Sequence, residues 1–302
     1  MKVLVTGVGG QLGYDVVNEL VERNFQTVGS DILGNANINS KAKYIQLDIT
    51  DREKVNQVIT EINPDAVIHC AAWTAVDLAE DEDKQAKVFA INVDGTRYIA
   101  DACKKNDCKM IYISTDYVFN GQGTEPWQED CKNHTPLNVY GKSKLYGEFA
   151  VQETMEKYFI IRVSWAFGIN GNNFIKTILN LGKRLSDLSV VNDQIGTPTY
   201  TFDLARLLVD MVETEKYGYY HATNEGGYIS WYDFACEIFK QAGYDTKVKS
   251  VTTAEYGLSK AARPFNSRLG KDKLLENGFT PLPDWKDALS RYLKTLENGS
   301  NE

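Results

Sequence analysis

Short runs rich in β-branched residues alternate with longer helical patterns through the first 165 residues, and this alternation constrains the fold more than any other feature. Alternating strands and helices indicate βαβ units and a parallel sheet. The expected strands are nearly continuous apolar runs, as when helices cover both faces of a sheet. The pattern therefore predicts an α/β fold. Strands are expected at residues 2–6, 26–30, 44–47, 66–69, 110–114 and 159–163, and helices at 11–23, 51–62, 83–105 and 138–156.

The alternation weakens after about residue 165, where the chain becomes rich in aromatic residues and less periodic. This last third predicts a smaller lobe that covers the open end of the sheet. Residues 252–270 carry no regular pattern, and residues 298–302 are expected to be disordered. Helices are expected at 173–183, 201–212, 231–242 and 285–296.

Composition argues against several classes of function. The net charge of −8 disfavours a nucleic-acid or anionic-membrane partner. No apolar run approaches the roughly 18 residues that a membrane-spanning helix needs. The five cysteines are odd in number and form no Cys-x-x-Cys pair, which predicts free thiols in a reducing compartment, the cytoplasm.

A glycine-rich turn, Gly7-Val8-Gly9-Gly10-Gln11-Leu12-Gly13, joins the first expected strand to the first expected helix. Glycines let the backbone turn sharply and approach a pyrophosphate, while the helix N-terminus supplies free N–H groups. Asp31 ends the second strand, 18 residues after Gly13, where an acidic residue would bind the hydroxyls of an adenosine ribose. Taken alone, Asp31 is explained more simply as a surface residue that caps a turn.

The turn and the strand pattern together predict a Rossmann-type doubly wound parallel sheet with a smaller C-terminal substrate-binding lobe. The NAD(P)-binding domain is expected to span residues 1–165, with returning segments near 193–225. The substrate-binding lobe would then consist of residues 166–192 and 226–302.

Tyr140 and Lys144 are four residues apart at the start of an expected helix, so they share one helix face. A free tyrosine has a pKa of about 10, and an ammonium group at about 4 Å would lower it by up to about 3 units before desolvation is counted. The pair alone is equally typical of a helix surface. Thr115 favours catalysis, because it ends the fifth strand and its hydroxyl can hold a carbonyl oxygen beside the tyrosine.

Further motifs are spread over the whole chain: TGVGGQLG at 6–13, CAAWTAVDLAE at 70–80, INVDGT at 91–96, ISTDYVFNG at 113–121, PLNVYGKSKLYGE at 136–148, RVSWAFG at 162–168, DQIGTPT at 193–199, ISWYDFACEIF at 229–239 and ARP at 262–264. With these motifs the chain resembles the extended short-chain dehydrogenases/reductases. Within them, it resembles the dTDP-4-dehydrorhamnose reductases.

The resemblance implies a catalytic trio of Thr115, Tyr140 and Lys144, with Asn92 supporting the active-site helix. The cofactor would be lined by Gly7, Gly10, Gln11, Leu12, Asp31, Asp48, Ile49, Ala71, Ala72, Tyr140 and Lys144. Substrate-binding candidates are Trp73, Asp116, Tyr117, Trp165, Asn173 and Arg263. Trp165 and Tyr117 are equally explained as core aromatic residues, and Arg263 as a solvated surface arginine.

The implied reaction is NAD(P)H-dependent reduction of the C4 keto group of dTDP-4-dehydro-6-deoxy-L-mannose to dTDP-L-rhamnose. NADH is favoured over NADPH, because Asp31 would repel a 2′-phosphate and residues 32–35 offer no cation. Two alternatives stay open. One is reduction of another keto sugar nucleotide, and the other is a non-catalytic regulatory subunit resembling methionine adenosyltransferase beta. The expected partner is a nucleotide sugar, with a homodimer as a candidate assembly and no carboxylate cluster that demands a metal ion.

Overall fold

Seven parallel strands form the sheet of the larger domain in the computed structural model, which describes residues 1–299. They are β1 (Lys2–Thr6), β2 (Gln26–Asp31), β3 (Lys43–Gln46), β4 (Ala66–His69), β5 (Lys109–Thr115), β6 (Tyr158–Val163) and β11 (Gly218–His221). Their order, β11-β6-β5-β4-β1-β2-β3, changes direction at β1. Val3 of β1 pairs with Thr27 of β2 on one side and with Ala66 of β4 on the other. The predicted doubly wound parallel sheet is confirmed, and β11 is a strand that the sequence pattern did not reveal.

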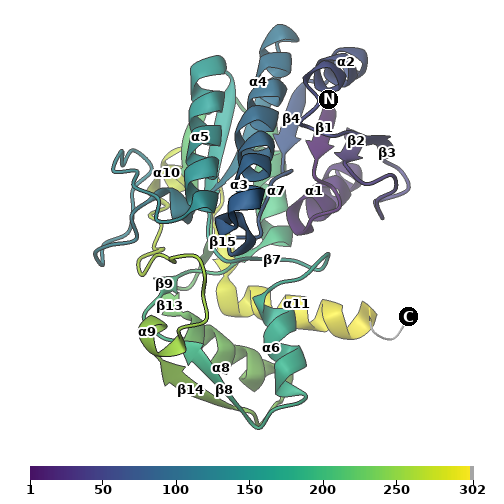
Figure 1. Ribbon diagram of the computed structural model, residues 1–302. Helices are drawn as coiled ribbons and strands as arrows, with labels where there is room; N and C mark the ends of the chain where they lie inside the picture. The colour runs from purple at the N-terminus through teal and green to yellow at the C-terminus, as the bar shows by residue number, and fades with distance from the viewer. Residues whose placement is uncertain (300–302) are drawn as a thin grey trace.

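Helices cover both faces of this sheet (Figure 1). One face carries α1 (Gln11–Glu22) and α7 (Thr201–Val212), and the other carries α2 (Arg52–Ile62), α4 (Thr96–Lys105) and α5 (Val139–Thr154). Val16 and Leu208 belong to the core of the first face, and Ile99 and Val151 to the core of the second. Burying a side chain of this size stabilises a fold by about 1.5–3 kcal/mol. The open ends of the strands stay free for a site.

The single helix expected at residues 83–105 is divided by a π-helical segment. It consists of α3 (Glu82–Phe89), the π-helical segment Ala90–Gly95 and α4. The helix packs very closely on the chain after β3 here, since a Cβ on Gly95 would lie 2.9 Å from the Ile49 side chain. Isolated π turns are frequent at functional sites because they place a side chain out of the normal helical register.

The smaller lobe lies below the sheet in Figure 1 and has its own hydrophobic core. Its main elements are α6 (Phe174–Gly182), β8 (Asp187–Val191), α8 (Trp231–Ala242), β14 (Lys247–Val251), α9 (Thr253–Tyr256) and α11 (Trp285–Gly299). Ile178, Phe234, Trp285 and Tyr292 are buried in that core. Ser230 caps α8 as predicted, through a capping box with Asp233. Two-stranded pairings complete the lobe and its junction: β8 with β14, β7 (Ala166–Phe167) with β10 (Thr199–Tyr200), β9 (Ile195–Gly196) with β13 (Ile229–Ser230), and β12 (Asn224–Glu225) with β15 (Leu282–Asp284).

Two expectations for the C-terminal region need correction. The segment around α10 (Asp272–Glu276), assigned from sequence to the smaller lobe, packs into the larger domain, because Leu274 and Phe279 fill its core beside Tyr220. Helix α11 continues to Gly299, so the chain is helical at 298–299, where disorder was expected. Residues 300–302 of that expectation lie outside the described residues. All five cysteines are free thiols, and none of the described helices is long and apolar enough to cross a membrane.

Candidate active site

The glycine-rich turn between β1 and α1 is packed too tightly for larger residues at two of its positions. Gly7 adopts φ +74°, and a Cβ there would lie 2.5 Å from the Ala71 nitrogen after β4. A Cβ on Gly13 would lie 2.3 Å from the Gly7 carbonyl oxygen. Gly10 caps α1 without a side-chain hydrogen bond, which leaves the first N–H groups of the helix available to an anion. The turn thus has the form that a pyrophosphate requires.

A cavity of about 510 Å³ lies in front of this turn, at the carboxyl ends of the strands, where ligands bind in open α/β sheets. It brings together all the residues predicted to line a cofactor: Gly7, Gly10, Gln11, Leu12, Asp31, Asp48, Ile49, Ala71, Ala72, Tyr140 and Lys144. Its size and its lining fit an adenine dinucleotide. Among residues 1–299, no three His, Cys, Asp or Glu side chains are placed to hold a metal ion.

Several residues of the cavity wall were not among the residues that the sequence predicted to line a cofactor. Lys87 and Ile91 come from the helix that the π-helical segment divides, and Val163 from the end of β6. Thr201 and Leu204 come from α7. These residues are far from the glycine-rich turn in sequence, so only the order of strands and helices places them beside it.

The carboxylate of Asp31 lies against the glycine-rich turn. Its Oδ2 accepts a hydrogen bond from the Gly9 nitrogen at 2.8 Å, and its Oδ1 accepts one from the Leu33 nitrogen at 3.3 Å. These bonds fix the side chain at the cavity wall and leave lone pairs on both oxygens for a ligand. The cations that line the cavity, within the described residues, are Lys87 and Lys144.

Tyr140 and Lys144 share one face of α5 and both line the cavity. The helix begins at Val139 because the Asn138 side chain accepts a hydrogen bond from the Gly141 nitrogen at 2.7 Å. The ammonium of Lys144 lies 4.1 Å from the centre of the Tyr112 ring, and the residue is only 3% exposed. Both side chains therefore line the cavity from α5, whose N-terminus is capped by Asn138.

The pKa of Tyr140 is raised, which is opposite to the direction expected from its pairing with Lys144. Burial is the main cause; a hydrogen bond with Thr115 opposes it and the charge of Asp116 adds to it. Burial also lowers the pKa of Lys144 to about 7, against the attraction of Glu148 and Cys70. Desolvation of both groups therefore outweighs the attraction between a phenolate and an ammonium. A neutral phenol is the form that can donate a proton.

Thr115, Asp116 and Tyr117 follow one another at the end of β5. The Thr115 hydroxyl donates a hydrogen bond to Asp116 Oδ1 at 3.0 Å and accepts one from the Tyr117 nitrogen at 3.2 Å. The rings of Tyr117 and Tyr140 meet edge to face, with their centroids 5.8 Å apart. The structure therefore brings the third member of the predicted trio, Thr115, beside Tyr140.

Asn92 connects the active-site helix to the loop after β4. Its Oδ1 accepts a hydrogen bond from the Trp73 nitrogen at 2.8 Å, and its Nδ2 donates to the Trp73 carbonyl oxygen at 3.1 Å. The same Nδ2 donates to Ser143 Oγ at 2.8 Å, and that hydroxyl donates to the Tyr140 carbonyl oxygen at 2.7 Å. Asn92 reaches these partners from the π-helical segment, and it is buried.

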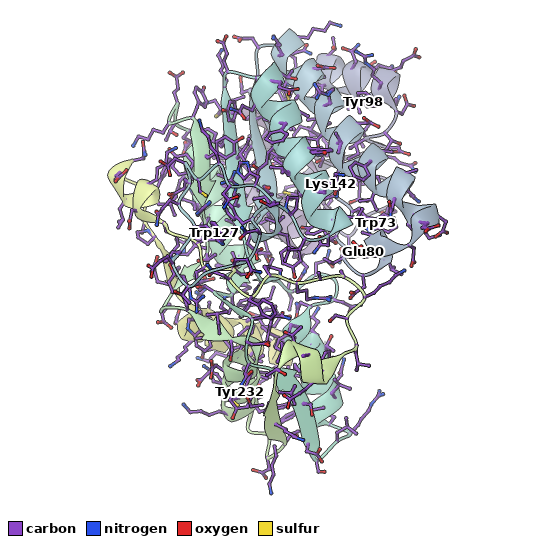
Figure 2. All side chains as sticks on the ribbon, turned by 60° about the vertical axis from the view of Figure 1, so that its left-hand side comes forward. Trp73, Glu80, Tyr98, Trp127, Lys142 and Tyr232 are labelled. Atoms are coloured by element: carbon purple, nitrogen blue, oxygen red, sulfur yellow. The ribbon has the colours of Figure 1, made fainter. Side chains whose placement is uncertain are left out.

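The six predicted substrate-binding residues lie outside the cavity lining. Trp73 lies at the end of the larger domain that faces the smaller lobe, near Glu80 (Figure 2). Trp165 adopts φ +50° and stacks on Trp231 with ring centroids 3.8 Å apart. That stacking agrees with the alternative in which Trp165 is a packed aromatic residue of the protein. Its partner, Trp231, is the first residue of α8 in the smaller lobe.

Two substrate-binding candidates have protein partners that the sequence did not reveal. Asn173 caps α6 and its Nδ2 donates to Gln11 Oε1 and the Tyr292 hydroxyl, each at 2.9 Å, so its polar atoms join the two parts of the molecule. Arg263 donates to both carboxylate oxygens of Asp77, at 3.1 and 2.6 Å. A substrate would have to share Arg263 with this carboxylate, and Asn173 has no hydrogen left to offer.

A buried ion pair supports the site from behind. Arg162 of β6 donates to both oxygens of Glu148 in α5, at 2.9 and 2.8 Å, and both side chains are almost fully buried. Ser114, the residue before Thr115, donates to Glu148 at 2.5 Å. Because Glu148 is one helical turn beyond Lys144, this pair fixes α5 relative to the ends of β5 and β6.

Comparison with known proteins agrees with this geometry. Residues 1–298 match the model of the RmlD substrate binding domain family. A spore coat polysaccharide biosynthesis protein of Bacillus subtilis is 39% identical, with 97% of each chain covered. The crystal structure of a dTDP-4-dehydrorhamnose reductase from Clostridium acetobutylicum is 39% identical, with a TM-score of 0.90 and coverage of 98% of this chain and 100% of that one.

A dTDP-4-dehydrorhamnose reductase from Bacillus anthracis, solved in complex with NADP, is 40% identical with a TM-score of 0.87, covering 97% of this chain and 99% of that one. Its NADP gives no support to the preference for NADH that Asp31 suggested. The predicted resemblance and the predicted enzyme class are confirmed. The chain belongs to the RmlD substrate-binding domain family and is an NAD(P)H-dependent oxidoreductase of the dTDP-4-dehydrorhamnose reductase type.

Proposed function

We propose that the protein reduces the C4 keto group of dTDP-4-dehydro-6-deoxy-L-mannose and forms dTDP-L-rhamnose. The observation that carries this proposal is the single cavity that joins the glycine-rich turn to Tyr140 and Lys144. The names of the Clostridium acetobutylicum and Bacillus anthracis relatives support the choice of substrate. Thr115, Tyr140 and Lys144 are proposed as the catalytic trio.

The protein's own groups would handle the keto oxygen. The nicotinamide, when bound, supplies the hydride. Tyr140 keeps its proton at neutral pH because burial raises its pKa, and it gives that proton to the oxygen as negative charge develops. The Thr115 hydroxyl stabilises the same oxygen by a hydrogen bond. Lys144, with its pKa lowered to about 7, adds positive charge beside the site as the pH falls.

Two alternatives are distinguished by particular observations. A related keto sugar nucleotide is a rival substrate, because the Bacillus subtilis relative is named for spore coat polysaccharide rather than for dTDP-rhamnose. A non-catalytic regulatory subunit is the rival from another class. The trio beside the open cavity favours an enzyme over that rival, since a binding module has no need of a tyrosine, a lysine and a threonine at one point.

The experiment that tests the proposal is product identification. The purified protein is incubated with dTDP-4-dehydrorhamnose and NADH or NADPH, and the product is analysed by NMR. We expect dTDP-L-rhamnose, recognised from the configuration at C4. A product with the opposite configuration would point to another deoxysugar, and no turnover with any dTDP-keto sugar would support the regulatory subunit.

The choice of cofactor is a separate proposal. We propose that both cofactors are accepted, that NADH is favoured, and that Asp31 sets the ratio by disfavouring a 2′-phosphate. Asp31→Ala should shift the ratio of kcat/KM towards NADPH by about tenfold, the effect of about 1.4 kcal/mol. Asp187→Ala, at an exposed aspartate of β8, is the matched control. An unchanged ratio in Asp31→Ala would mean that Asp31 only caps its turn.

The remaining sequence-based expectations stay proposals. A cytoplasmic location is proposed from the five free thiols. A homodimer is proposed as the assembly, and sedimentation equilibrium measures it directly. The smaller lobe is proposed to hold the nucleotide sugar, because it covers the open ends of the strands (Figure 1).

A further inference from the structure

A loop that leads into the smaller lobe lies against the glycine-rich turn of the larger domain. The loop consists of residues 168–173, between β7 and α6. The Nδ2 of Asn170 donates a hydrogen bond to the Gly9 carbonyl oxygen at 2.9 Å and, over a longer distance of 3.4 Å, to the Gly10 carbonyl oxygen. The residues that line the cavity do not include Asn170. Its amide therefore reaches the turn from outside the cavity.

Gly9 is held by side chains from two different parts of the chain. Its nitrogen donates to Asp31 Oδ2, at the end of β2, at 2.8 Å, and its carbonyl oxygen accepts the hydrogen bond from Asn170. Glycine has more backbone freedom than any other residue, so a turn built from glycines depends on outside contacts to keep one conformation. Asp31 and Asn170 supply such contacts on the two sides of Gly9.

The loop itself is anchored on both sides of Asn170. The ammonium of Lys176 in α6 donates to the carbonyl oxygens of Ile169 at 2.5 Å and of Gly171 at 2.7 Å. The Gly168 nitrogen donates to Gln11 Oε1 at 2.8 Å. The backbone before and after Asn170 is thus fixed, and the Asn170 side chain is directed at the turn.

The hydrogen bond from Asn170 has a direct effect on the next N–H group. In a trans peptide the carbonyl and the following N–H point in opposite directions. With the Gly9 carbonyl held by Asn170, the Gly10 N–H is on the other side, where it donates to the Gly7 carbonyl oxygen at 3.1 Å and closes the turn. Gly10 is also the N-cap of α1, so the closed turn sets the direction of the first N–H groups of that helix. Those groups have no partner within the helix and are the ones that a diphosphate would bind.

We propose that Asn170 is a positioning residue for the diphosphate of the cofactor. It acts through the glycine-rich turn and does not touch the cofactor. The cofactor affinity of the larger domain therefore depends on a loop that leads into the smaller lobe. The proposal rests on the oxidoreductase class of the chain and on the cavity as the cofactor site, and it is independent of which keto sugar is reduced.

The test compares two ligands that differ in their phosphates, in the variant Asn170→Ala. ADP carries both adenosine and a diphosphate, whereas adenosine carries no phosphate, and titrations followed by NMR measure the affinity of each. We expect Asn170→Ala to weaken ADP binding by about tenfold, the effect of one lost hydrogen bond, and to leave adenosine binding within about twofold of the wild type. Asn172→Ala is the matched control, because Asn172 is exposed on the same loop, and it should change neither affinity.

A second variant separates this role from a general contribution to the contact between the two parts of the molecule. Arg291→Met removes the ion pair with Asp203, which joins α11 to α7. It should lower the free energy of unfolding, measured by urea denaturation, without changing the ratio of the ADP and adenosine affinities. In steady-state kinetics Asn170→Ala should raise KM for NADH by about tenfold with kcat unchanged, because Tyr140 and Lys144 are on another helix.

Three outcomes would overturn the proposal. The first is an ADP affinity in Asn170→Ala equal to that of the wild type. The second is an equal loss of affinity for ADP and adenosine, which would mean that Asn170 shapes the whole cavity. The third is an Arg291→Met variant that changes the ratio of the two affinities as much as Asn170→Ala does. Neither ligand is a keto sugar, so failure of the proposed function would leave these measurements unchanged.

Discussion

Tyr140 and Lys144 lie one helical turn apart, yet burial moves their pKa values in opposite directions. Above pH 7 both groups are largely neutral, and Lys144 gains its charge as the pH falls through about 7. The raised pKa of Tyr140 therefore fits its proposed role as a donor that holds its proton until an alkoxide begins to form.

Tyr140→Phe should lower kcat by about 10²–10⁴, because the ring remains and the proton donor is lost. Cofactor affinity should change much less, and fluorescence titration with the cofactor measures it. Tyr146→Phe is the matched control, since Tyr146 lies on the same helix with 40% of its surface exposed. Near-normal kcat in Tyr140→Phe would show that the hydroxyl is not the donor.

The sequence predicted the residues that line the cavity better than it predicted the contacts of the substrate-binding candidates. The glycine-rich turn and Asp31 lie within the first strand–helix–strand unit of the chain. The spacing of residues within that unit fixes their positions relative to one another. Asn173 and Arg263 were harder, because their partners Gln11, Tyr292 and Asp77 are more than 100 residues away. The pKa direction of Tyr140 was also missed, since the degree of burial is set by the whole fold rather than by the spacing to Lys144.

At the scale of elements, α5 is tied to the sheet by the buried pair Glu148–Arg162 and by Ser114. Coulombic attraction from Glu148 also acts on Lys144, so the pair influences both the position of the helix and the charge of its lysine. Removing one partner would leave the other charge buried without compensation.

Arg162→Met should lower the free energy of unfolding by about 3–5 kcal/mol, measured by urea denaturation. The double variant Arg162→Met, Glu148→Leu should recover most of this loss, because no buried charge remains. Arg97→Met is the control: Arg97 pairs with Glu153 on the exposed side of α4 and α5, and its loss should cost less than about 1 kcal/mol. If Arg162→Met lowered the free energy of unfolding as little as Arg97→Met does, the Glu148–Arg162 pair would not be needed for stability.

The element pattern explains which parts of the fold the sequence could predict. All six strands expected in the first 165 residues are present, because each is a short run of strand-forming residues that stands apart from the longer helical patterns. The pairs of the smaller lobe were not predicted, since strands of two to five residues leave little periodicity. The π-helical segment Ala90–Gly95 was missed for a related reason: one extra residue in a long helix hardly changes its apolar pattern.

At the scale of the whole molecule, the two parts are joined at both ends of the site. At the cofactor end, Arg291 of α11 donates to both oxygens of Asp203 in α7, each at 2.8 Å. At the segment between β4 and α3, residues 260–263 bind the larger domain through Arg263 with Asp77 and Lys260 with Asp81. The site is thus spanned by contacts between residues far apart in sequence.

Arg263→Ala should raise KM for the nucleotide sugar by about tenfold with a smaller change in kcat, because a cation facing a diphosphate contributes mainly ground-state binding. Asp77→Ala separates this role from a purely structural one. It also breaks the ion pair but frees the guanidinium, so KM should stay level or fall. Equal increases in KM for both variants would assign Arg263 to the junction alone.

The π-helical segment has a consequence for how this chain tolerates insertions and deletions. A residue in an α-helix advances by about 100°, so deleting one residue between Ala90 and Gly95 would restore regular winding and turn Asn92 away from its partners. Trp73 and Ser143 would then lose the amide that holds them. Homologous chains that keep this amide must keep the surplus residue too, so the length of this helix is as much a part of the site as the identity of its side chains.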